Sequence, residues 1–360
     1  MSNILEYLEL KNVGPIKKAK IETKKINVFI GKNATGKSIV AKLLQVKREK
    51  ENLKDYNLDE FIKDESKIVY KSNKFVHKKL SIWDIFIKSL EKDIAIEYLK
   101  KSLEKQSKKL EKLLENSEIN LDELLEKFFT RKNSYYIPVE RNLVPFFSSY
   151  GINLLSSKIP LPQYVVEFAT EFRLAKDKIK SKKVLNFEYK FEDDEDKLYF
   201  DNKNYISLKN ASSGIQTILP LYLTIEYLNK DGKKHYILEE PELNLFPKEQ
   251  FELVKYMVKN SESTIFITHS PYVLYSLNLL IYAFKVGNMN KKARELVENV
   301  IPSCYWIDYN NFSAYYFEEG KIKKFFKEDI EENLLDDVSL ELEEIFDELR
   351  EIYIRVKNEL

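Results

Sequence analysis

One run of residues has the types and spacing needed to bind phosphate. Gly31-Lys32-Asn33-Ala34-Thr35-Gly36-Lys37-Ser38 fits the pattern G-x-x-x-x-G-K-[ST], follows the apolar run 26–30 and precedes the helix-compatible segment 39–44. In a strand–loop–helix context the backbone N–H groups of such a loop point at phosphates. Lys37 is then expected to reach the β- and γ-phosphates, and the Ser38 hydroxyl to sit on Mg²⁺. The alternative is an ordinary glycine turn, and the flanking segments favour nucleotide binding.

Two later strands are expected to end in groups that act on a phosphate. The apolar stretch 235–238 ends in Glu239 and Glu240, and the stretch 264–267 ends in Thr268 and His269. Open α/β sheets bind ligands at the carboxyl ends of their strands. We therefore expect Glu239 to hold Mg²⁺ through water, Glu240 to orient and deprotonate the attacking water, and His269 to contact a γ-phosphate. An acidic surface turn and a structural histidine are the plainer interpretations, and the upstream loop outweighs them.

A second anion site is indicated at the start of a later helix. Ser213 and Gly214 stand just before the apolar helix candidate 217–228. A hydroxyl can donate there, and a glycine lets backbone N–H groups approach an anion closely. Plain helix capping would require the same residue types.

The elements that must position these groups predict an α/β fold. The segments 4–10 and 16–21 alternate apolar with polar residues around a turn at 12–15, which predicts an antiparallel hairpin. Two strand-then-helix units at 235–257 and 264–280 predict a largely parallel sheet. A further strand is expected at 135–142.

Three other segments are interpreted as follows. Residues 51–132 are charged and predict a compact helical insertion, in which Lys100-Lys101 and Lys108-Lys109 mark a solvated face or a nucleic-acid surface. The acidic patch 192–196 is typical of a solvated turn rather than a metal site. In the segment 331–360, apolar residues four and three apart predict an amphipathic C-terminal helix that docks on its own domain, with a partner contact as the alternative.

Composition limits the classes of protein. The 360 residues are 44% hydrophobic with a formal net charge of +1, so a sizeable core is expected and no global positive charge argues for nucleic acid. The single cysteine, Cys304, excludes an internal disulfide framework and is expected to be a core thiol. No signal peptide and no membrane-length apolar run are evident, so a cytoplasmic location without membrane contact is expected.

The ordered set GKNATGKS, SSGIQ, YILEEPELNLFP and ITHSP resembles the ABC-type ATPases, in the branch with SMC and RecF-like proteins and the ATPase half of OLD-family nucleases. The resemblance implies a two-lobed head (residues 1–50 and 133–330) with a mixed central sheet, which forms a homodimer around two ATP molecules. Position by position it implies that Lys37 and Ser38 are the Walker A pair, that Glu239 is the Walker B acid, and that Glu240 is the catalytic glutamate. It implies that His269 is the switch histidine and that Ser213 and Gly214 act in trans. Glu140 and Arg141 stand at the Q-loop position, and Lys11 and Asn12 are implied nucleotide contacts from the first hairpin.

The chain also departs from that pattern. SSGIQ stands in place of LSGGQ and Glu239 in place of the usual Asp, the insertion is too short for long coiled-coil arms, and no Toprim nuclease pattern follows His269. The resulting hypothesis is a Mg²⁺- and ATP-dependent dimeric ATPase that serves DNA repair or defence with a separate effector protein, with DNA as a possible partner. The alternative is a nucleotide-gated scaffold or sensor that sequesters an effector with little turnover.

Overall fold

The computed structural model describes residues 3–49, 56–72, 132–145, 161–184, 187–193, 195–201, 204–324 and 340–358. The chain divides into two compact units, residues 1–72 with 134–360 and residues 73–133. Nearly all of the second unit, with Lys100-Lys101 and Lys108-Lys109, lies outside the described residues. The first unit is the α/β body that follows.

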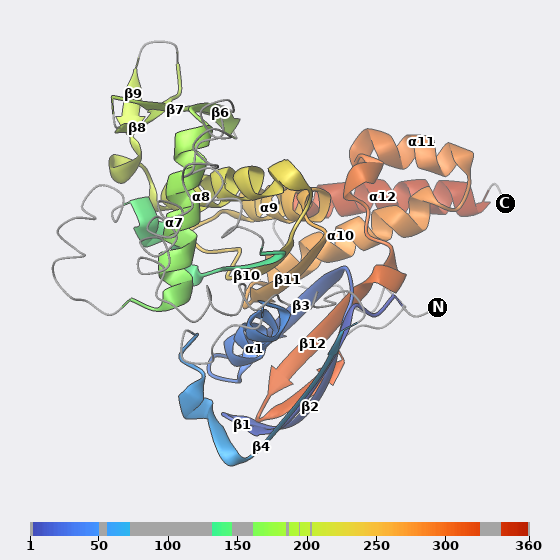
Figure 1. Ribbon diagram of the computed structural model, residues 1–360. Helices are drawn as coiled ribbons and strands as arrows, with labels where there is room; N and C mark the ends of the chain where they lie inside the picture. Colours follow the sequence, from blue (N-terminus) through green and yellow to red (C-terminus); the bar gives the residue numbers. More distant parts are fainter. Residues whose placement is uncertain are drawn as a thin grey trace, which may run out of the picture. The chain divides into compact units, whose positions relative to one another are not determined.

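The strands of the main sheet come from both halves of the chain (Figure 1). They are β1 (Glu6–Val13), β2 (Ile16–Thr23), β3 (Ile26–Gly31), β4 (Ile62–Ser72), β5 (Ser134–Ile137), β10 (His235–Glu239), β11 (Ser263–Thr268), β12 (Phe312–Glu318) and β13 (Lys321–Lys324). The helices of this unit are α1 (Lys37–Glu49), α7 (Gln163–Lys178), α8 (Ser213–Leu228), α9 (Pro247–Asn260), α10 (Pro271–Gly287), α11 (Lys291–Val300) and α12 (Leu340–Asn358).

The main sheet is mixed, as the sequence predicted. Its order is β4-β1-β2-β13-β12-β3-β11-β10-β5. The β1–β2 hairpin and the β1–β4 pair are antiparallel, whereas β12–β3, β3–β11, β11–β10 and β10–β5 are parallel. The predicted N-terminal hairpin and the two strand-then-helix units are therefore confirmed.

Alternation along the central strands builds a separate apolar core on each face of the sheet. On β10, Tyr236 and Leu238 join the core shared with α8, α9 and α10, while Ile237 joins the core shared with α1 and the β1–β2 hairpin. Val28 and Phe29 on β3 divide in the same way. Successive side chains of a strand point to opposite faces, so a buried strand contributes side chains to both cores.

A second, four-stranded antiparallel sheet precedes α8. Its strands are β6 (Ser181–Val184), β7 (Phe187–Glu192), β8 (Glu195–Tyr199) and β9 (Tyr205–Ser207). Glu192 pairs with Glu195 at the end of the β7–β8 hairpin, so the acidic patch lies at a strand–strand turn, as expected. Asp194 lies outside the described residues. No group of residues that could hold a metal ion occurs within the ranges that the structure describes. Asp196 is an exception to a solvated loop, because its buried carboxylate accepts hydrogen bonds from Lys176 and Tyr189.

The C-terminal helix α12 packs on its own unit, which is the favoured of the two sequence interpretations. Leu349, Ile352 and Val356 are buried in the same core as α10 and α11. The Phe346 ring centroid lies 5.5 Å from that of Tyr282 on α10.

Two sequence expectations are wrong. The stretch 62–72, assigned to the helical insertion 51–132, forms β4 and pairs with β1, because the edge of the hairpin offers a partner that local composition does not indicate. Cys304 is exposed rather than a core thiol. No helix among the described residues is long and apolar enough to cross a membrane.

Candidate functional site

Four parallel strands end side by side at one edge of the main sheet. β3 delivers the glycine loop, its neighbour β11 delivers His269, the next strand β10 delivers Glu239 and Glu240, and β5 leads to Glu140. Registers place Ile30 opposite Thr268 and Ile267 opposite Glu239. Segments more than 200 residues apart in sequence are thereby brought to one place.

Strained backbone and close packing shape the glycine loop between β3 and α1. Gly31 has φ 146° and Gly36 has φ 99°. A Cβ on Gly31 would lie 2.2 Å from the carbonyl oxygen of Phe317, and one on Gly36 would lie 2.9 Å from Ile16. Only glycine combines such φ values with such close approach, so β12 and the hairpin turn fix the loop from both sides.

The side chain of Lys37 folds back over this loop. Its Nζ donates to the carbonyl oxygens of Gly31 at 2.8 Å and Lys32 at 2.7 Å, and the residue is 5% exposed. Burial lowers the pKa of Lys37 to about 8, although the nearby carboxylates of Glu240, Glu242 and Glu239 oppose that shift. Lys37 is thus a desolvated cation that carbonyl dipoles hold beside three acids.

Glu240 stands where β10 turns away from the sheet. It has φ 41°, an unusual conformation for a residue with a side chain, and its N–H donates to the Ile267 carbonyl oxygen at 2.8 Å. Burial and the neighbouring Glu242 raise the pKa of Glu240, while His269 acts to lower it. The carboxylate of Glu240 and the imidazole of His269 therefore share one electrostatic environment.

Arg141 supports this turn from below. Its guanidinium is completely buried and donates to the carbonyl oxygens of Pro138 at 2.9 Å, Glu239 at 2.6 Å and Glu240 at 2.5 Å. Burial lowers the pKa of Arg141 to about 10. In this conformation Arg141 acts on the site through the backbone of the β10 end, and direct nucleotide contact by Arg141 or by half-buried Glu140 stays a prediction.

Glu242 organises the end of β11, and it was not singled out from the sequence. Its carboxylate accepts from Thr268 Oγ1 at 2.9 Å, from the His269 N–H at 2.8 Å and from the Ser270 N–H at 3.0 Å. These bonds tie the segment after β10 to the segment that presents His269. The signal in the sequence was a third acid, two positions after the predicted catalytic one.

Lys42 is a second residue that sequence reasoning missed. It lies on α1, its Nζ donates to the Tyr164 hydroxyl at 3.1 Å and lies 4.2 Å from the centre of that ring. Burial lowers the pKa of Lys42, against the opposing effect of Glu239 and Glu140. Lys42 thus places a positive charge near Glu239 and Glu140.

The SSG segment packs against the loop that follows Glu240 in the same chain. A Cβ on Gly214 would lie 2.8 Å from the carbonyl oxygen of Asn244, and Asn244 Nδ2 donates to Thr217 Oγ1. Ser213 begins α8 and is exposed, so it is open to a ligand or a partner. Its action in trans stays a prediction.

The predicted hairpin contacts lie in a different setting. Asn12, with φ 54°, belongs to the β1–β2 hairpin, and its carbonyl oxygen accepts from Ser66 Oγ on β4. Asn12 also borders an open pocket of about 460 Å³ with Lys17 and Phe61. The turn of this hairpin touches Gly36, but no hydrogen bond among the described residues joins Lys11 or Asn12 to the loop. Nucleotide contact by Lys11 and Asn12 stays a prediction.

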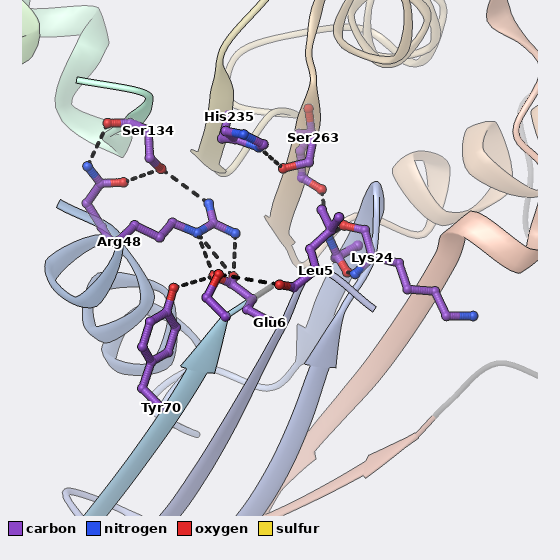
Figure 2. A network of polar contacts seen from close by, with 12 residues as sticks. Leu5, Glu6, Lys24, Arg48, Tyr70, Ser134, His235 and Ser263 are labelled. Carbon is purple, nitrogen blue, oxygen red and sulfur yellow. Dashed lines mark hydrogen bonds and ion pairs between the residues drawn. The ribbon is translucent and has the colours of Figure 1, made fainter. Parts of the chain in front are cut away.

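The opposite end of α1 carries a dense buried polar network (Figure 2). Arg48 donates to the Glu6 carboxylate, with Nη2 2.6 Å from Oε1, and both side chains are fully buried. The Tyr70 hydroxyl donates to Glu6 at 2.9 Å, and Arg48 Nη1 donates to Ser134 Oγ at 3.2 Å. Gln45 closes the network by exchanging two bonds with Ser134. α1, β1, β4 and β5 are thereby joined below the glycine loop.

The donor set fits a magnesium ion held together with a nucleotide. Ser38 and Glu239 offer a hydroxyl and a carboxylate, the hard oxygen ligands that Mg²⁺ prefers. Glu239 is 7% exposed at the β10 end. No group of three or more His, Cys, Asp or Glu residues that could hold a metal ion occurs in the described part of the chain.

Comparisons with known proteins match part of the chain to one family model and the chain to several solved structures. Residues 161–274 match the family of the AAA ATPase domain. No curated protein matches the chain. Among solved structures, the SMC head bound to the C-winged helix domain of ScpA is 14% identical, with 89% of this chain and 97% of that chain covered and a TM-score of 0.39. The SMC head domain from Thermotoga maritima is 13% identical (91% and 100% covered, TM-score 0.37), and so is RecF with ATP (90% and 98% covered, TM-score 0.37).

The mixed sheet, the glycine loop between β3 and α1 and the acids at the end of β10 are the features expected of a P-loop ATPase. The match to the AAA ATPase domain extends from α7 to β11, so this part of the chain is similar to ATPases of that family. This match supports ATP binding and hydrolysis as the general activity.

Proposed function

We propose that the head hydrolyses ATP by in-line attack of water on the γ-phosphate, with Glu240 as the base. The observation that carries this proposal is that Lys37, Glu240 and His269 share one electrostatic environment at a single sheet edge. The raised pKa of Glu240 makes its carboxylate a better proton acceptor than an exposed glutamate.

In this mechanism each group has one task. Lys37 exchanges the carbonyl oxygens of the loop for the β- and γ-phosphates, and its charge offsets the negative charge of the transition state. Glu240 takes a proton from the attacking water, the bond between the γ-phosphorus and the bridging oxygen breaks, and ADP leaves with the electron pair. His269 contacts the γ-phosphate oxygens. Mg²⁺ held by Ser38 and Glu239 would neutralise phosphate charge when bound.

We further propose that two heads close around two ATP molecules, with Ser213 and Gly214 acting on the partner's nucleotide. Ser213 is exposed, and Phe246, on the loop that packs against Gly214, is 79% exposed. An exposed aromatic side chain beside exposed donors suits an interface. DNA repair or defence in the cytoplasm, with a separate effector and with DNA as a possible partner, is the biological setting that the family resemblance supports.

Glu240→Gln is the decisive variant. Turnover should fall about 100- to 10,000-fold, because the base is lost, while ATP binding persists and ATP with Mg²⁺ holds the protein as a dimer. Steady-state phosphate release and light scattering after gel filtration measure the two effects. Glu295→Gln, at an exposed site on α11, is the control. If Glu240→Gln hydrolyses ATP like the parent, Glu240 is not the base.

A nucleotide-gated scaffold or sensor is the second candidate. The departure SSGIQ at the exposed start of α8 favours it, since weak activation in trans leaves ATP bound for longer. Single-turnover hydrolysis with and without DNA separates the two candidates. Slow turnover that DNA does not accelerate, together with an effector that co-purifies, would favour the sensor.

A further inference from the structure

An open pocket of about 390 Å³ lies between β6, α8 and α9, and none of its lining residues belongs to the site described above. Four of the lining residues are lysines and three are tyrosines, against a single carboxylate. The volume lies in the range of small-ligand sites, about 300–1,000 Å³. The chain as a whole has a net charge of only +1, so this is a local concentration of positive charge.

Ion pairs neutralise only part of this charge. Lys255 Nζ lies 2.6 Å from the Glu252 carboxylate, and Lys182 pairs with Glu226. Lys183 and Lys259 are exposed and form no ion pair within the described ranges. No carboxylate among the described residues neutralises these two ammonium groups, so their charge can attract an anion.

The aromatic wall distinguishes this pocket from a simple basic patch. The Tyr305 ring is half-buried, and the ammonium groups of Lys255 and Lys259 lie 5.4 Å and 5.6 Å from its centre. Tyr256 packs edge-on against Tyr222, with ring centroids 4.3 Å apart. An aromatic face stacks on a base while adjacent ammonium groups take phosphate. An acidic peptide would use the lysines and leave the rings unused.

We propose that this pocket is a second ligand site, which binds a phosphorylated nucleoside either as a free nucleotide or as the end of a nucleic-acid strand. Lys183 and Lys259 bind the phosphate, and Tyr305 stacks on the base. The site is independent of the glycine loop, so it stands or falls separately from ATP hydrolysis.

The test uses the full chain with Lys37→Ala throughout, so that tight nucleotide binding at the glycine loop is removed. The probes are fluorescent mant-AMP and a fluorescein-labelled single strand of twelve deoxythymidines, with anisotropy as the readout. Lys183→Glu with Lys259→Glu should weaken binding at least tenfold and lower the salt slope for the strand by about two. Tyr305→Ala should weaken it about fivefold or more, and Tyr305→Phe should restore it. Lys291→Glu with Lys321→Glu, two exposed lysines elsewhere, is the matched control.

The two probes identify the source of the ligand. If the pocket variants bind only mant-AMP more weakly, the ligand is a free nucleotide. If they bind only the strand more weakly, the ligand is a strand end, and weaker binding of both probes supports a phosphorylated nucleoside from either source. Equal binding by the pocket and control variants overturns the proposal, as does binding of neither probe. Competition by poly-glutamate that Tyr305→Ala leaves unchanged also overturns it, in favour of an acidic peptide.

Discussion

The two ends of α1 bury cations in opposite ways. At the first residue of the helix, Lys37 is bonded to backbone carbonyl oxygens and its pKa is lowered to about 8. Three turns later, Arg48 is locked to the Glu6 carboxylate, with both side chains fully buried. A helix of 13 residues is about 20 Å long, so one rigid rod carries both.

The difference fits the ligand site proposed at Lys37 and a structural site at Arg48. Carbonyl oxygens hold Lys37 without neutralising it, so a phosphate gains a full charge interaction when it replaces them. The Glu6 carboxylate already neutralises Arg48, and Tyr70 and Ser134 occupy further bonding positions. The proposed phosphate binding at Lys37 thus requires a cation without a paired carboxylate. Stability at Arg48 requires a cation that is paired with one.

Breaking the ion pair between Arg48 and Glu6 should have the largest effect. Arg48→Met leaves the Glu6 carboxylate buried without its counter-charge, which should lower the free energy of unfolding by about 3–5 kcal/mol. Urea unfolding followed by fluorescence measures the loss. Arg48→Met combined with Glu6→Gln should lose clearly less, because no unpaired charge remains. An unchanged urea midpoint for the single variant would contradict the comparison.

Raising the pH should weaken ATP binding at the other end. The pKa of Lys37 is about 8 in the empty protein, and bound phosphates raise it, so binding above pH 8 takes up a proton. ATP affinity should be level from pH 7 to 8 and then fall by up to tenfold per pH unit. Titration calorimetry at pH 7, 8 and 9 measures the slope. Lys37→Arg stays charged over this range, so an equal slope in that variant would rule out Lys37 as its source.

A moderate effect on turnover is expected from Glu242, which bonds to the segment that follows β11. Glu242→Gln weakens the bonds to Thr268, His269 and Ser270 and should lower turnover about tenfold, or about 1.4 kcal/mol. ATP affinity should change less than about twofold, since Glu242 holds the chain rather than the phosphates. Glu298→Gln, in an exposed ion pair with Arg294, is the control. A tenfold loss of affinity with normal turnover would show that Glu242 contacts the nucleotide.

The smallest effect should come from trimming the network without removing a charge. Tyr70→Phe deletes one of the bonds to Glu6 and should cost about 1 kcal/mol of unfolding free energy, because Arg48 still pairs with the carboxylate. Tyr7→Phe, whose hydroxyl bonds to Glu9, should cost less than about 0.5 kcal/mol. Equal losses for the two would mean that burial does not strengthen the Tyr70 bond.

Sequence reasoning succeeded where local pattern and chemistry coincide. The glycine loop, the hairpin and the ends of β10 and β11 were predicted because their residue types indicate both backbone shape and position along a strand. It failed for β4, which carries a charged residue at many positions and forms beside β1. The resemblance placed Arg141 at the Q-loop position, but the sequence could not predict its bonds to the carbonyl oxygens of Glu239 and Glu240, which depend on β5 lying next to β10.

By itself the sequence determined a glycine loop with the phosphate-binding pattern and two later strands that end in acids or a histidine, because those features are local in the chain. Only the tertiary structure decided that β3, β11, β10 and β5 are neighbours, that Lys42 lies near Glu239, and that Lys183 and Tyr305 line one pocket. Long-range strand pairing depends on the burial summed over whole faces rather than on any local propensity. For that reason the sequence indicated which residue types could act on a phosphate, whereas it did not indicate which other residues lie next to them in the fold.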